Sequence, residues 1–579
     1  MNIFSYYKDF ISNILIELAK EDKVIDELPL YKFTVEPPRE LNHGDLATNA
    51  CLILSKYFKS NPLNLASRIL PKIKKLDEVH SVSIKKPGFI NFFLHKNFWH
   101  KQIKTILEHE ENYGKSNLGK GKNINVEFVS ANPTGPLHVG HLRGAVIGDS
   151  LSNILSKVGF KVTKEYYVND AGNQIDILAK SVFLRYQEII TCEKVNIPEG
   201  FYPGEYLVPI AKKIFEIHKD ELLKLDEKER LEIIKKISIE HNLSKIKNDL
   251  KQINIQMDVF TSEKKLIKDK LVIKSVNLLE KRNFIYEGIL PPPKNSHNDD
   301  WEPKKQKLFK STEFGDEVDR TIYKSDGTLT YFASDIAYHM DKLDRTKGSL
   351  INIWGADHSG YIKRMCAAVE AISGKKDELD VKTCQMVNLI KDKKVLKMSK
   401  RLGSFITLKD IVDEVGSDAV RFIMLTRRND QPLDFDFNKV TERSRENPVF
   451  YVQYAFARAS SVIQKARNLG VQISNLEDID LSLLTHNSQI NLCKFLVSWP
   501  KTLEQSATYH EPHRIAFYLI ELSSIFHSLW TLGRENEEIR FFHDTNQKLT
   551  LANLALISAT KLILGIGLSL LSVSCPEEM

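Results

Sequence analysis

The chain has 579 residues, which is too long for one ordinary hydrophobic core and predicts two to four domains. Its hydrophobic content of 42% and charged content of 27% are typical of a soluble globular protein. A formal net charge of +7 permits an acidic partner without requiring one. The six cysteines include no Cys-x-x-Cys pair and no dense framework, which argues against a zinc site and against secretion.

No targeting or membrane segment is expected. Lys8 and Asp9 interrupt the early apolar residues and no small-residue cleavage site follows, which argues against a signal peptide. The most apolar stretch, Leu551 to Leu571, contains Asn553 and Lys561, so we expect a packed terminal helix rather than a membrane span. A cytoplasmic protein without a membrane partner is therefore predicted.

Residues 1–115 are expected to form an N-terminal α+β domain. Its pattern predicts a helix over Ile3 to Leu18, a helix around Leu46 to Phe58 and strands near His80 to Ile84 and Phe89 to Leu94. Its lysines would allow a contact with nucleic acid, although a solvated face is the default interpretation. A polar segment with several glycines then predicts a linker that ends near residue 120.

The stretch from Ile124 to Phe160 predicts a strand, a phosphate-facing loop and a helix. An apolar run enters the turn Ser130 to Pro136, in which two prolines and a glycine interrupt both neighbouring elements. Apolar residues then recur every three or four positions, which predicts a helix that starts near Leu137 or His138. With a second strand over Lys161 to Val168, this stretch predicts a βαβ unit of a parallel sheet.

His138, Gly140 and His141 lie at the start of this helix, where parallel strands end. Two imidazoles three residues apart share one helix face, and the glycine between them lets a flat ligand approach the backbone. The helix N-terminus favours a polyphosphate. The bare pattern arises by chance about as often as not, but its position favours a function. A zinc site would need a third ligand, so we interpret the histidines as donors to ATP phosphates.

Residues 180–300 are helical and densely charged, which predicts an insertion into the sheet domain. Two β-prone runs between Arg320 and Ala333 flank Asp326-Gly327 and predict a hairpin whose second arm delivers Tyr331 and Asp335. A second strand, turn and helix passage follows. Its strand, Leu350 to Ile353, ends at Trp354-Gly355-Ala356-Asp357-His358.

The next segment predicts a basic loop. Val387 to Leu396 favours a short hairpin with Asp392 at its turn, and it leads into Lys397-Met398-Ser399-Lys400-Arg401. Three cations within five residues would suit a mobile arm over a polyphosphate. An exposed basic loop is the alternative and would be favoured for this segment alone, but the histidine pair favours the phosphate. Helices are predicted over Leu408 to Glu442, and an all-helical bundle of about 130 residues from Asn447 to the end.

The two signatures, His138-Val-Gly-His141 and Lys397-Met-Ser-Lys-Arg401, together resemble those of class I aminoacyl-tRNA synthetases. Val126 to Arg143 is similar to the arginyl-tRNA synthetase family, and so are four further segments. These are Tyr167 to Gln174, Phe314 to Asp335, Gly355 to His358 and Asn447 to Ala455. Val139 stands where isoleucine is usual and Arg401 where serine is usual.

The resemblance implies a multidomain α/β fold. It has a Rossmann-like parallel-sheet catalytic domain over residues 120–440, with the insertion at about 180–300. An N-terminal α+β domain that contacts tRNA, residues 1–115, would precede it, and a helical anticodon-binding domain, residues 445–579, would follow it.

The same resemblance implies an arginine–tRNA ligase. ATP and L-arginine would give arginyl-adenylate and pyrophosphate, and the arginyl group would pass to the 3′-terminal ribose of tRNA(Arg). ATP would act as a substrate together with Mg²⁺, with no structural metal, no membrane and a monomeric enzyme.

Site residues follow from the family pattern. The catalytic candidates are His138, His141, Lys397 and Lys400. The ATP-binding candidates are His138, Gly140, His141, Gly355, Asp357, His358, Met398 and Ser399. The arginine-binding candidates are Glu127, Asn132, Tyr331 and Asp335. Guanidinium is a planar fork that demands carboxylates in matching geometry, so Glu127 and Asp335, with the Tyr331 hydroxyl, are the candidates for it. Asn132 is the candidate for the α-ammonium group of arginine. For Glu127, a paired structural charge within the strand is the alternative.

Two other functions remain open at this point. Small-molecule nucleotidylyltransferases also place His-x-Gly-His in a βαβ unit, but they are usually far shorter and lack a helical tail. A non-catalytic paralogue of a synthetase would keep the fold and would be favoured by loss of a histidine or lysine from either signature. All four are present here.

Overall fold

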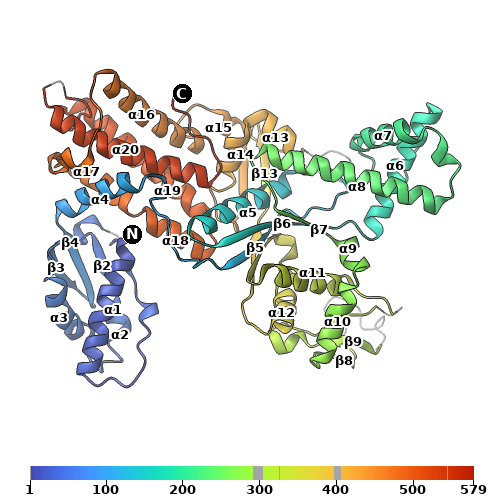
Figure 1. Cartoon of the computed structure of the whole chain (residues 1–579), viewed down its shortest axis with the longest axis horizontal. Coiled ribbons are helices and arrows are strands. Elements are labelled where there is room, and N and C mark those ends of the chain that lie inside the picture. The colour runs from blue at the N-terminus through green and yellow to red at the C-terminus, as the bar shows by residue number, and fades with distance from the viewer. Residues whose placement is uncertain (1, 39, 291–303, 325–326, 397–405, 544) are drawn as a thin grey trace.

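The computed structural model of the chain describes residues 2–38, 40–290, 304–324, 327–396, 406–543 and 545–579. An N-terminal module lies beside a bundle built from the last part of the chain, and a central sheet separates the bundle from two groups of helices (Figure 1). The predicted site residues Lys397, Met398, Ser399 and Lys400 lie outside the described residues.

The N-terminal module is an antiparallel sheet in the order β1-β2-β4-β3, with helices around it. Its elements are α1 (Ile3–Glu21), β1 (Val35–Glu36), β2 (Leu46–Thr48), α2 (Ala50–Leu54), α3 (Pro62–Ile73), β3 (Val79–Lys85), β4 (Phe89–Leu94) and α4 (Lys96–His109). The helix predicted over Leu46 to Phe58 is wrong at its start. Leu46 and Thr48 alternate into the core and pair with β4, so helix begins only at Ala50.

The central sheet has five parallel strands in the order β12-β11-β5-β6-β7. The strands are β5 (Asn123–Glu127), β6 (Lys161–Val168), β7 (Val259–Ser262), β11 (Ser349–Gly355) and β12 (Leu379–Cys384). Helix α5 (Val139–Lys157) connects β5 to β6, which confirms the predicted βαβ unit and the parallel sheet. The carboxyl ends of β5 and β11, neighbours in the sheet, therefore open at the same edge.

Helices α6 (Asn173–Thr191), α7 (Val208–His218) and α8 (Glu227–Gln252) leave the sheet after β6 and enclose a small core of their own. The chain then returns to the sheet as β7. Part of the range expected to be an insertion thus forms the edge strand, because four intermediate-burial residues, Val259 to Ser262, pair with β6.

Beyond β7 the chain forms α9 (Glu263–Lys268), α10 (Leu271–Lys281), β8 (Ile285–Gly288), β9 (Gln306–Phe309), β10 (Arg320–Thr321), α11 (Tyr331–Thr346) and α12 (Ile362–Ser373). The hairpin predicted over Arg320 to Ala333 is wrong in its second arm. An antiparallel bridge joins Tyr323 to Leu329, but α11 begins at Tyr331 and Asp335 lies one turn further on. Phe332, Ala333, Ile336 and Ala337 recur at helical spacing and are buried, which favours helix there.

The predicted hairpin at Asp392 is confirmed. Strands β13 (Val387–Lys391) and β14 (Lys394–Val395) are antiparallel, and Asp392 and Lys393 both have positive φ, as a tight two-residue turn requires. The region predicted as wholly helical contains α13 (Leu408–Val415), α14 (Ser417–Ile423) and α15 (Phe437–Thr441). It is interrupted by β15 (Leu433–Asp436), whose alternating buried Leu433 and Phe435 pair with β13.

The C-terminal part is the predicted all-helical bundle. It consists of α16 (Pro448–Asn468), α17 (Asn487–Val497), α18 (Trp499–Tyr509), α19 (His513–Glu535) and α20 (Gln547–Leu570). Among the described residues, α19 and α20 are long and apolar enough to cross a membrane, a test that core helices of soluble proteins also pass. Helix α20 packs against α16, α19 and α4, and most of its apolar stretch is buried.

Candidate active site

The histidine pair caps helix α5. Nδ1 of His138 accepts the Gly140 N–H at 3.1 Å, and Nδ1 of His141 accepts the His138 N–H at 3.3 Å. The ring centroids lie 4.0 Å apart. Because each Nδ1 accepts a hydrogen bond, each neutral imidazole carries its proton on Nε2, which makes Nε2 a donor. A Cβ at Gly140 would lie 2.9 Å from Cε1 of His138, so the glycine makes room for this ring.

A buried arginine fixes the first turns of α5. Arg143 is 1% exposed, and its guanidinium donates to the carbonyl oxygens of Gln431 at 2.6 Å, Arg428 at 2.8 Å and Gln385 at 3.2 Å. These carbonyls lie at the end of β12 and in the loop before β15. A guanidinium has five N–H donors and can bind several carbonyls at once. These hydrogen bonds fix the start of α5 relative to the end of β12 and the loop before β15.

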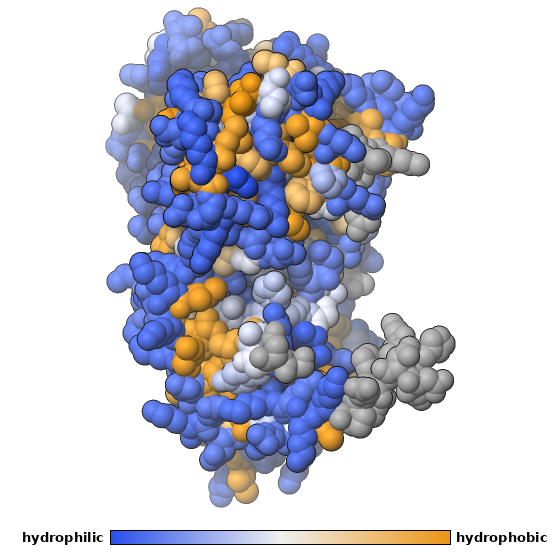
Figure 2. All heavy atoms as spheres, turned by 90° about the vertical axis from the view of Figure 1, so that its right-hand side faces the viewer, coloured by the Kyte–Doolittle hydropathy of each residue, from blue (hydrophilic) through white to orange (hydrophobic). Residues whose placement is uncertain are grey.

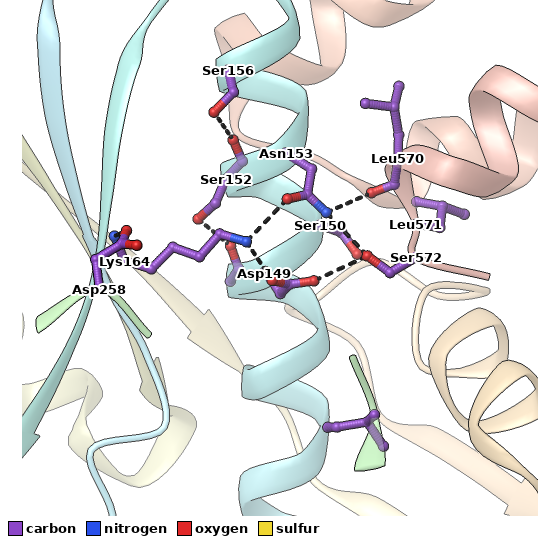
Figure 3. Close-up of polar contacts among 12 residues, drawn as sticks. Asp149, Ser150, Ser152, Asn153, Ser156, Lys164, Asp258, Leu570, Leu571 and Ser572 are labelled. Carbon is purple, nitrogen blue, oxygen red and sulfur yellow. Dashed lines mark hydrogen bonds and ion pairs between the residues drawn. The ribbon is translucent and has the colours of Figure 1, made fainter. Parts of the chain in front are cut away.

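A second buried polar cluster holds the middle of α5. Asp149 accepts Nζ of Lys164 at 2.6 Å, and the same Nζ reaches Asn153 at 3.0 Å (Figure 3). Asp149 also pairs with Nη2 of Arg421 at 2.5 Å, and Nε of Arg421 donates to the Leu571 carbonyl at 2.6 Å. Asp149 and Arg421 are both essentially unexposed. The helix is thereby tied to the segment that follows α20 at the end of the bundle.

Two buried carboxyl groups, those of Asp335 and Glu263, form a cluster near the carboxyl ends of the strands. Asp335 on α11 accepts the Tyr361 hydroxyl at 2.5 Å, and burial raises its pKa to about 6. Glu263, the first residue of α9, is 5% exposed, and burial together with the charges of Asp335 and Asp170 raises its pKa to about 7. In the part of the chain that the structure describes, neither Asp335 nor Glu263 forms an ion pair. Such a cluster favours a cationic ligand.

Glu127, at the end of β5, already has a partner. Its Oε2 accepts Nζ of Lys342 at 2.7 Å and its Oε1 accepts the Ser130 hydroxyl at 2.9 Å. Lys342 is 0% exposed and donates also to Oδ1 of Asn352 at 2.7 Å. Nδ2 of Asn352 in turn lies 2.9 Å from Nε2 of His339. Glu127 is therefore a paired buried charge, and its part in binding arginine stays a prediction.

Three family models match consecutive parts of the chain. These are the arginyl tRNA synthetase N terminal domain over residues 6–94, the catalytic domain of tRNA synthetases class I (R) over 102–443, and the DALR anticodon binding domain over 452–579. Proteins named arginine–tRNA ligase from Azorhizobium caulinodans and Parvibaculum lavamentivorans are 46% and 47% identical to it, with 100% of both chains covered in each comparison. The chain belongs to the arginyl-tRNA synthetase family.

Solved structures agree with this assignment. A putative arginyl-tRNA synthetase from Campylobacter jejuni is 34% identical, with a TM-score of 0.73 over 84% of this chain and 100% of that one. The arginyl-tRNA synthetase of Thermus thermophilus is 18% identical and shares the fold, with a TM-score of 0.74 over 99% of this chain and 100% of that one. The synthetase is thus a class I enzyme, an arginine–tRNA ligase that uses ATP.

Most of the predicted site residues line one cleft of this synthetase, about 1770 Å³ in volume. They are Glu127, Asn132, His138, Gly140, His141, Asp335, Gly355, Asp357 and His358. Tyr331, the first residue of α11, is 64% exposed and stands apart from this lining. Its hydroxyl lies 3.6 Å from the point that a Cβ at Gly172 would occupy.

The contacts of the residues predicted to bind ATP at the end of β11, and of the residue predicted to bind the α-ammonium group of arginine, are as follows. Gly355 ends β11, and a Cβ there would lie 2.4 Å from Oδ1 of Asp357, so the glycine leaves room for that carboxylate. Asp357 and His358 are exposed and 3.6 Å apart. Asn132, in the turn after β5, donates to Oε1 of Gln174 at 2.6 Å.

Three residues around the carboxyl cluster were missed by the sequence analysis: Glu263, Lys342 and Tyr361. Glu263 directly follows β7, and a residue at the end of a parallel strand belongs to the ligand edge of the sheet. The prediction of an insertion over the whole range 180–300 hides this position at the end of a strand. Lys342 carried no detectable signal, since its partner Glu127 lies 215 residues away in the sequence.

Proposed function

We propose that this synthetase activates L-arginine with ATP in the cleft at the carboxyl ends of β5 and β11, and passes the arginyl group to the 3′-terminal ribose of tRNA(Arg). The observation that carries the proposal is the carboxyl pair Asp335 and Glu263, whose pKa values rise to about 6 and 7. A guanidinium is planar and permanently charged, so its arrival favours both carboxylates and restores their ionisation. Tyr361 orients Asp335 for this contact.

The carboxylate of arginine attacks the α-phosphorus of ATP. A bond forms between a carboxylate oxygen and phosphorus, the bond from phosphorus to the bridging oxygen of the leaving pyrophosphate breaks, and negative charge builds on the phosphate oxygens. We assign the Nε2–H groups of His138 and His141 to these oxygens, because the helix cap holds both rings in a donor tautomer at the positive end of α5.

Lys397 and Lys400 are proposed to stabilise the departing pyrophosphate, with Met398 and Ser399 beside the nucleotide. Support comes from the described residue that follows this segment. Thr407 forms an antiparallel bridge with His138, and the next N–H, of Leu408, donates to the Leu137 carbonyl at 2.8 Å. The chain leaving the lysine segment is therefore fixed beside the histidine pair.

The remaining roles are assigned by the position of each residue in the cleft. Gly140, Gly355, Asp357 and His358 are proposed to bind the adenosine of ATP, because β11 is the neighbour of β5 and both end at the same edge. Asn132 is proposed to bind the α-ammonium group of arginine, and Glu127 and Tyr331 are proposed to contact its guanidinium.

Mg²⁺ is proposed to accompany ATP. This ion is usually held by substrate phosphates with one or two carboxylates rather than by an all-protein cage. The described residues contain no group of three or more His, Cys, Asp or Glu side chains suited to a metal.

We assign tRNA contacts to residues 1–115, catalysis to 120–440 and anticodon binding to 445–579. The insertion at about 180–300 is interrupted by the edge strand β7 of the catalytic sheet. A monomer in the cytoplasm is the proposed form.

ATP–pyrophosphate exchange with each of the twenty amino acids tests the activation site. We expect exchange with arginine in the presence of Mg²⁺ and cognate tRNA, and arginylated tRNA as the product. Asp335→Asn and Glu263→Gln should each raise the arginine KM strongly while leaving the ATP KM within about twofold, because only the guanidinium loses a charged partner. Exchange with lysine in place of arginine would overturn the assignment of the pocket.

A further inference from the structure

The turn between β5 and α5 is held in place by side chains from outside the sheet. This turn, residues 130–136 and called the substrate turn below, contains Asn132 and leads into the histidine pair. It has no regular structure, so its backbone carbonyls need donors from elsewhere. Asn132 uses its Nδ2 to donate to Gln174, which makes Oδ1 the end of the amide suited to an ammonium group. The position of this oxygen depends on the conformation of the substrate turn.

Two carbonyls of the substrate turn accept hydrogen bonds from the insertion. The Pro133 carbonyl accepts Nδ2 of Asn242 at 2.7 Å. The Thr134 carbonyl accepts the hydroxyl of Tyr206 at 2.9 Å. Asn242 lies on α8 and is 3% exposed, and Tyr206 belongs to the 3₁₀ turn Glu205–Leu207 that precedes α7. A buried amide on a helix needs a hydrogen-bond partner, and the partner of Asn242 is the substrate turn.

The ring of Tyr206 fits between two glycines. A Cβ at Gly135, within the substrate turn, would lie 3.3 Å from Cζ of the ring, and a Cβ at Gly204 would lie 2.3 Å from its Cε1. Gly204 has a φ of −67°, which any residue can adopt, so this glycine is needed for space rather than for its backbone. Tyr206 and the substrate turn both line the cleft. The ring therefore packs directly on the turn that contains Asn132.

Helix α8 connects the insertion to the catalytic sheet. Ile234, in its first half, is buried in the core that α6, α7 and α8 enclose, and Tyr206 packs against the same core. Ile246 and Leu250, further along α8, belong to the main core. In Figure 1, α6 and α7 lie at the end of α8 that is remote from the sheet, and Figure 2, which views the molecule from that side, shows a mostly hydrophilic surface. The insertion is thus a module with its own core, and two of its hydrogen bonds reach the substrate turn.

We propose that Tyr206 and Asn242 are positioning residues for the activation of arginine, because they fix the substrate turn so that Oδ1 of Asn132 meets the α-ammonium group. This inference rests on the proposed function, in which Asn132 binds that group. The attacking carboxylate is bonded to the same carbon atom as the α-ammonium group, so Asn132 also sets the distance from the carboxylate to the α-phosphorus. Small displacements of a reacting group lower the rate strongly. The insertion therefore contributes to activation through the substrate turn.

The test compares the binding of arginine with that of the arginine analogue that lacks the α-amino group, by calorimetry on the full-length enzyme. Tyr206→Phe removes one hydroxyl and keeps the ring, and Asn242→Leu removes the amide and keeps a similar volume. The wild type should prefer arginine. In each variant we expect this preference to fall at least about fivefold, because an unpaired carbonyl lets the turn move. A general loss of structure would instead weaken both ligands equally.

Kinetics of ATP–pyrophosphate exchange supply a second measurement. In both variants kcat at saturating arginine should fall about tenfold or more, because the carboxylate is no longer aligned with the α-phosphorus, while the ATP KM should stay within about twofold.

Tyr186→Phe is the matched control. Tyr186 is 0% exposed, and its hydroxyl donates to the Lys219 carbonyl within the insertion. This variant therefore removes a hydroxyl of the same kind from the same core without a change at the substrate turn. Its preference for arginine over the analogue, and its kcat of exchange, should equal those of the wild type.

An unchanged preference for arginine in Tyr206→Phe overturns the proposal, and so does an equal fall in Tyr186→Phe. A rise of the ATP KM in place of the loss of preference also overturns it, since Tyr206 would then act on the nucleotide. Asn132→Ala distinguishes this inference from the proposed function. If the preference is lost in Asn132→Ala alone, Tyr206 and Asn242 have no positioning role, whereas an unchanged preference in Asn132→Ala refutes the assignment of Asn132 itself.

Discussion

Removing the buried partner of Glu127 tests the interpretation of the arginine pocket most directly. Lys342 is 0% exposed and Glu127 is 5% exposed, and their 2.7 Å contact joins β5 to α11 at the floor of the cleft. Lys342→Met leaves a buried carboxylate without a cation, which costs about 3–5 kcal/mol of folding free energy. Glu127→Gln leaves a buried ammonium that keeps its Asn352 contact, so a similar or somewhat smaller loss is expected.

The double variant Glu127→Gln/Lys342→Met removes both charges together. An apolar or neutral replacement of a whole buried pair is close to neutral, so most of the stability should return. At roughly 2–4 °C per kcal/mol, the conversion for a domain of about 150–250 residues, each single variant should lower Tm by at most roughly 6–20 °C, and the double variant by far less. The coupling energy from this cycle is the quantity of interest.

The arginine KM of the double variant then separates the two roles of Glu127. If Glu127 touches the substrate, stability returns while the arginine KM remains raised at least about tenfold, because a charged contact to the guanidinium is absent. A normal arginine KM would make Glu127 a structural charge only. Additive losses of Tm in the double variant would refute the reasoning about the buried pair itself.

Three further predictions concern the histidine cap of α5, the carboxyl cluster of Asp335 and Glu263, and the buried Asp149–Arg421 pair. His138→Asn keeps an N-cap acceptor but removes the Nε2–H donor. The kcat of pyrophosphate exchange should therefore fall about 10²–10³-fold, while Tm stays within about 3 °C of the wild type. A large loss of Tm would show that the capping role of His138 cannot be separated from its proposed donor role. In the folded chain the pKa of Asp335 is about 6 and that of Glu263 about 7, against usual values of 3.8 and 4.5. Folding therefore favours the protonated forms of both groups. The stability that they contribute is fully present below about pH 4 and is lost as the pH rises through 6 and 7. Relative to Asp335→Asn/Glu263→Gln, the ligand-free wild type should therefore lose Tm between pH 5 and 8, and saturating arginine should reverse that loss; a constant difference in Tm would refute the assignment. Asp149→Asn strands the buried guanidinium of Arg421 and should lower Tm by roughly 6–20 °C, whereas Asp344→Asn, which breaks an exposed pair with Lys347, should change it by less than about 3 °C.

What the sequence predicts well here is local. The sequence places His138 and His141 at the start of a helix, because a strand, a Pro/Gly turn and a helix start lie within twenty residues of one another and each has its own residue pattern. The hairpin at Asp392 is local in the same way, and the structure places Asp392 in its turn, as predicted. Elements that depend on distant partners were harder. Leu46 and Thr48 form a strand only because β4 is present to pair with them.

The carboxyl cluster shows the same limit in the candidate site. Asp335 was named from the family pattern, but its surroundings come from three separate elements: Tyr361 precedes α12, Glu263 begins α9, and Lys342 lies two turns further along α11. Helical spacing relates Lys342 to Asp335, but no periodicity in the sequence relates either residue to Tyr361 or Glu263. Their effect on each other, which raises two pKa values, exists only after the sheet has brought β7 and β11 to one edge.

The buried polar contacts of α5 hold His138 and His141, the proposed donors, in their positions. A donor stabilises a developing charge only if it is already oriented before the reaction, because reorientation would consume the gain. Three sets of contacts orient α5. The Nδ1 atoms of the two histidines accept N–H groups of the helix cap, and the guanidinium of Arg143 binds carbonyls near the strand ends. Asp149 pairs with Arg421, which also binds the Leu571 carbonyl after α20. The last of these is remote from the cleft. The bundle therefore takes part in positioning α5, the helix that carries the proposed histidine donors. Loss of the Asp149–Arg421 pair should slow activation even where the cleft itself is intact.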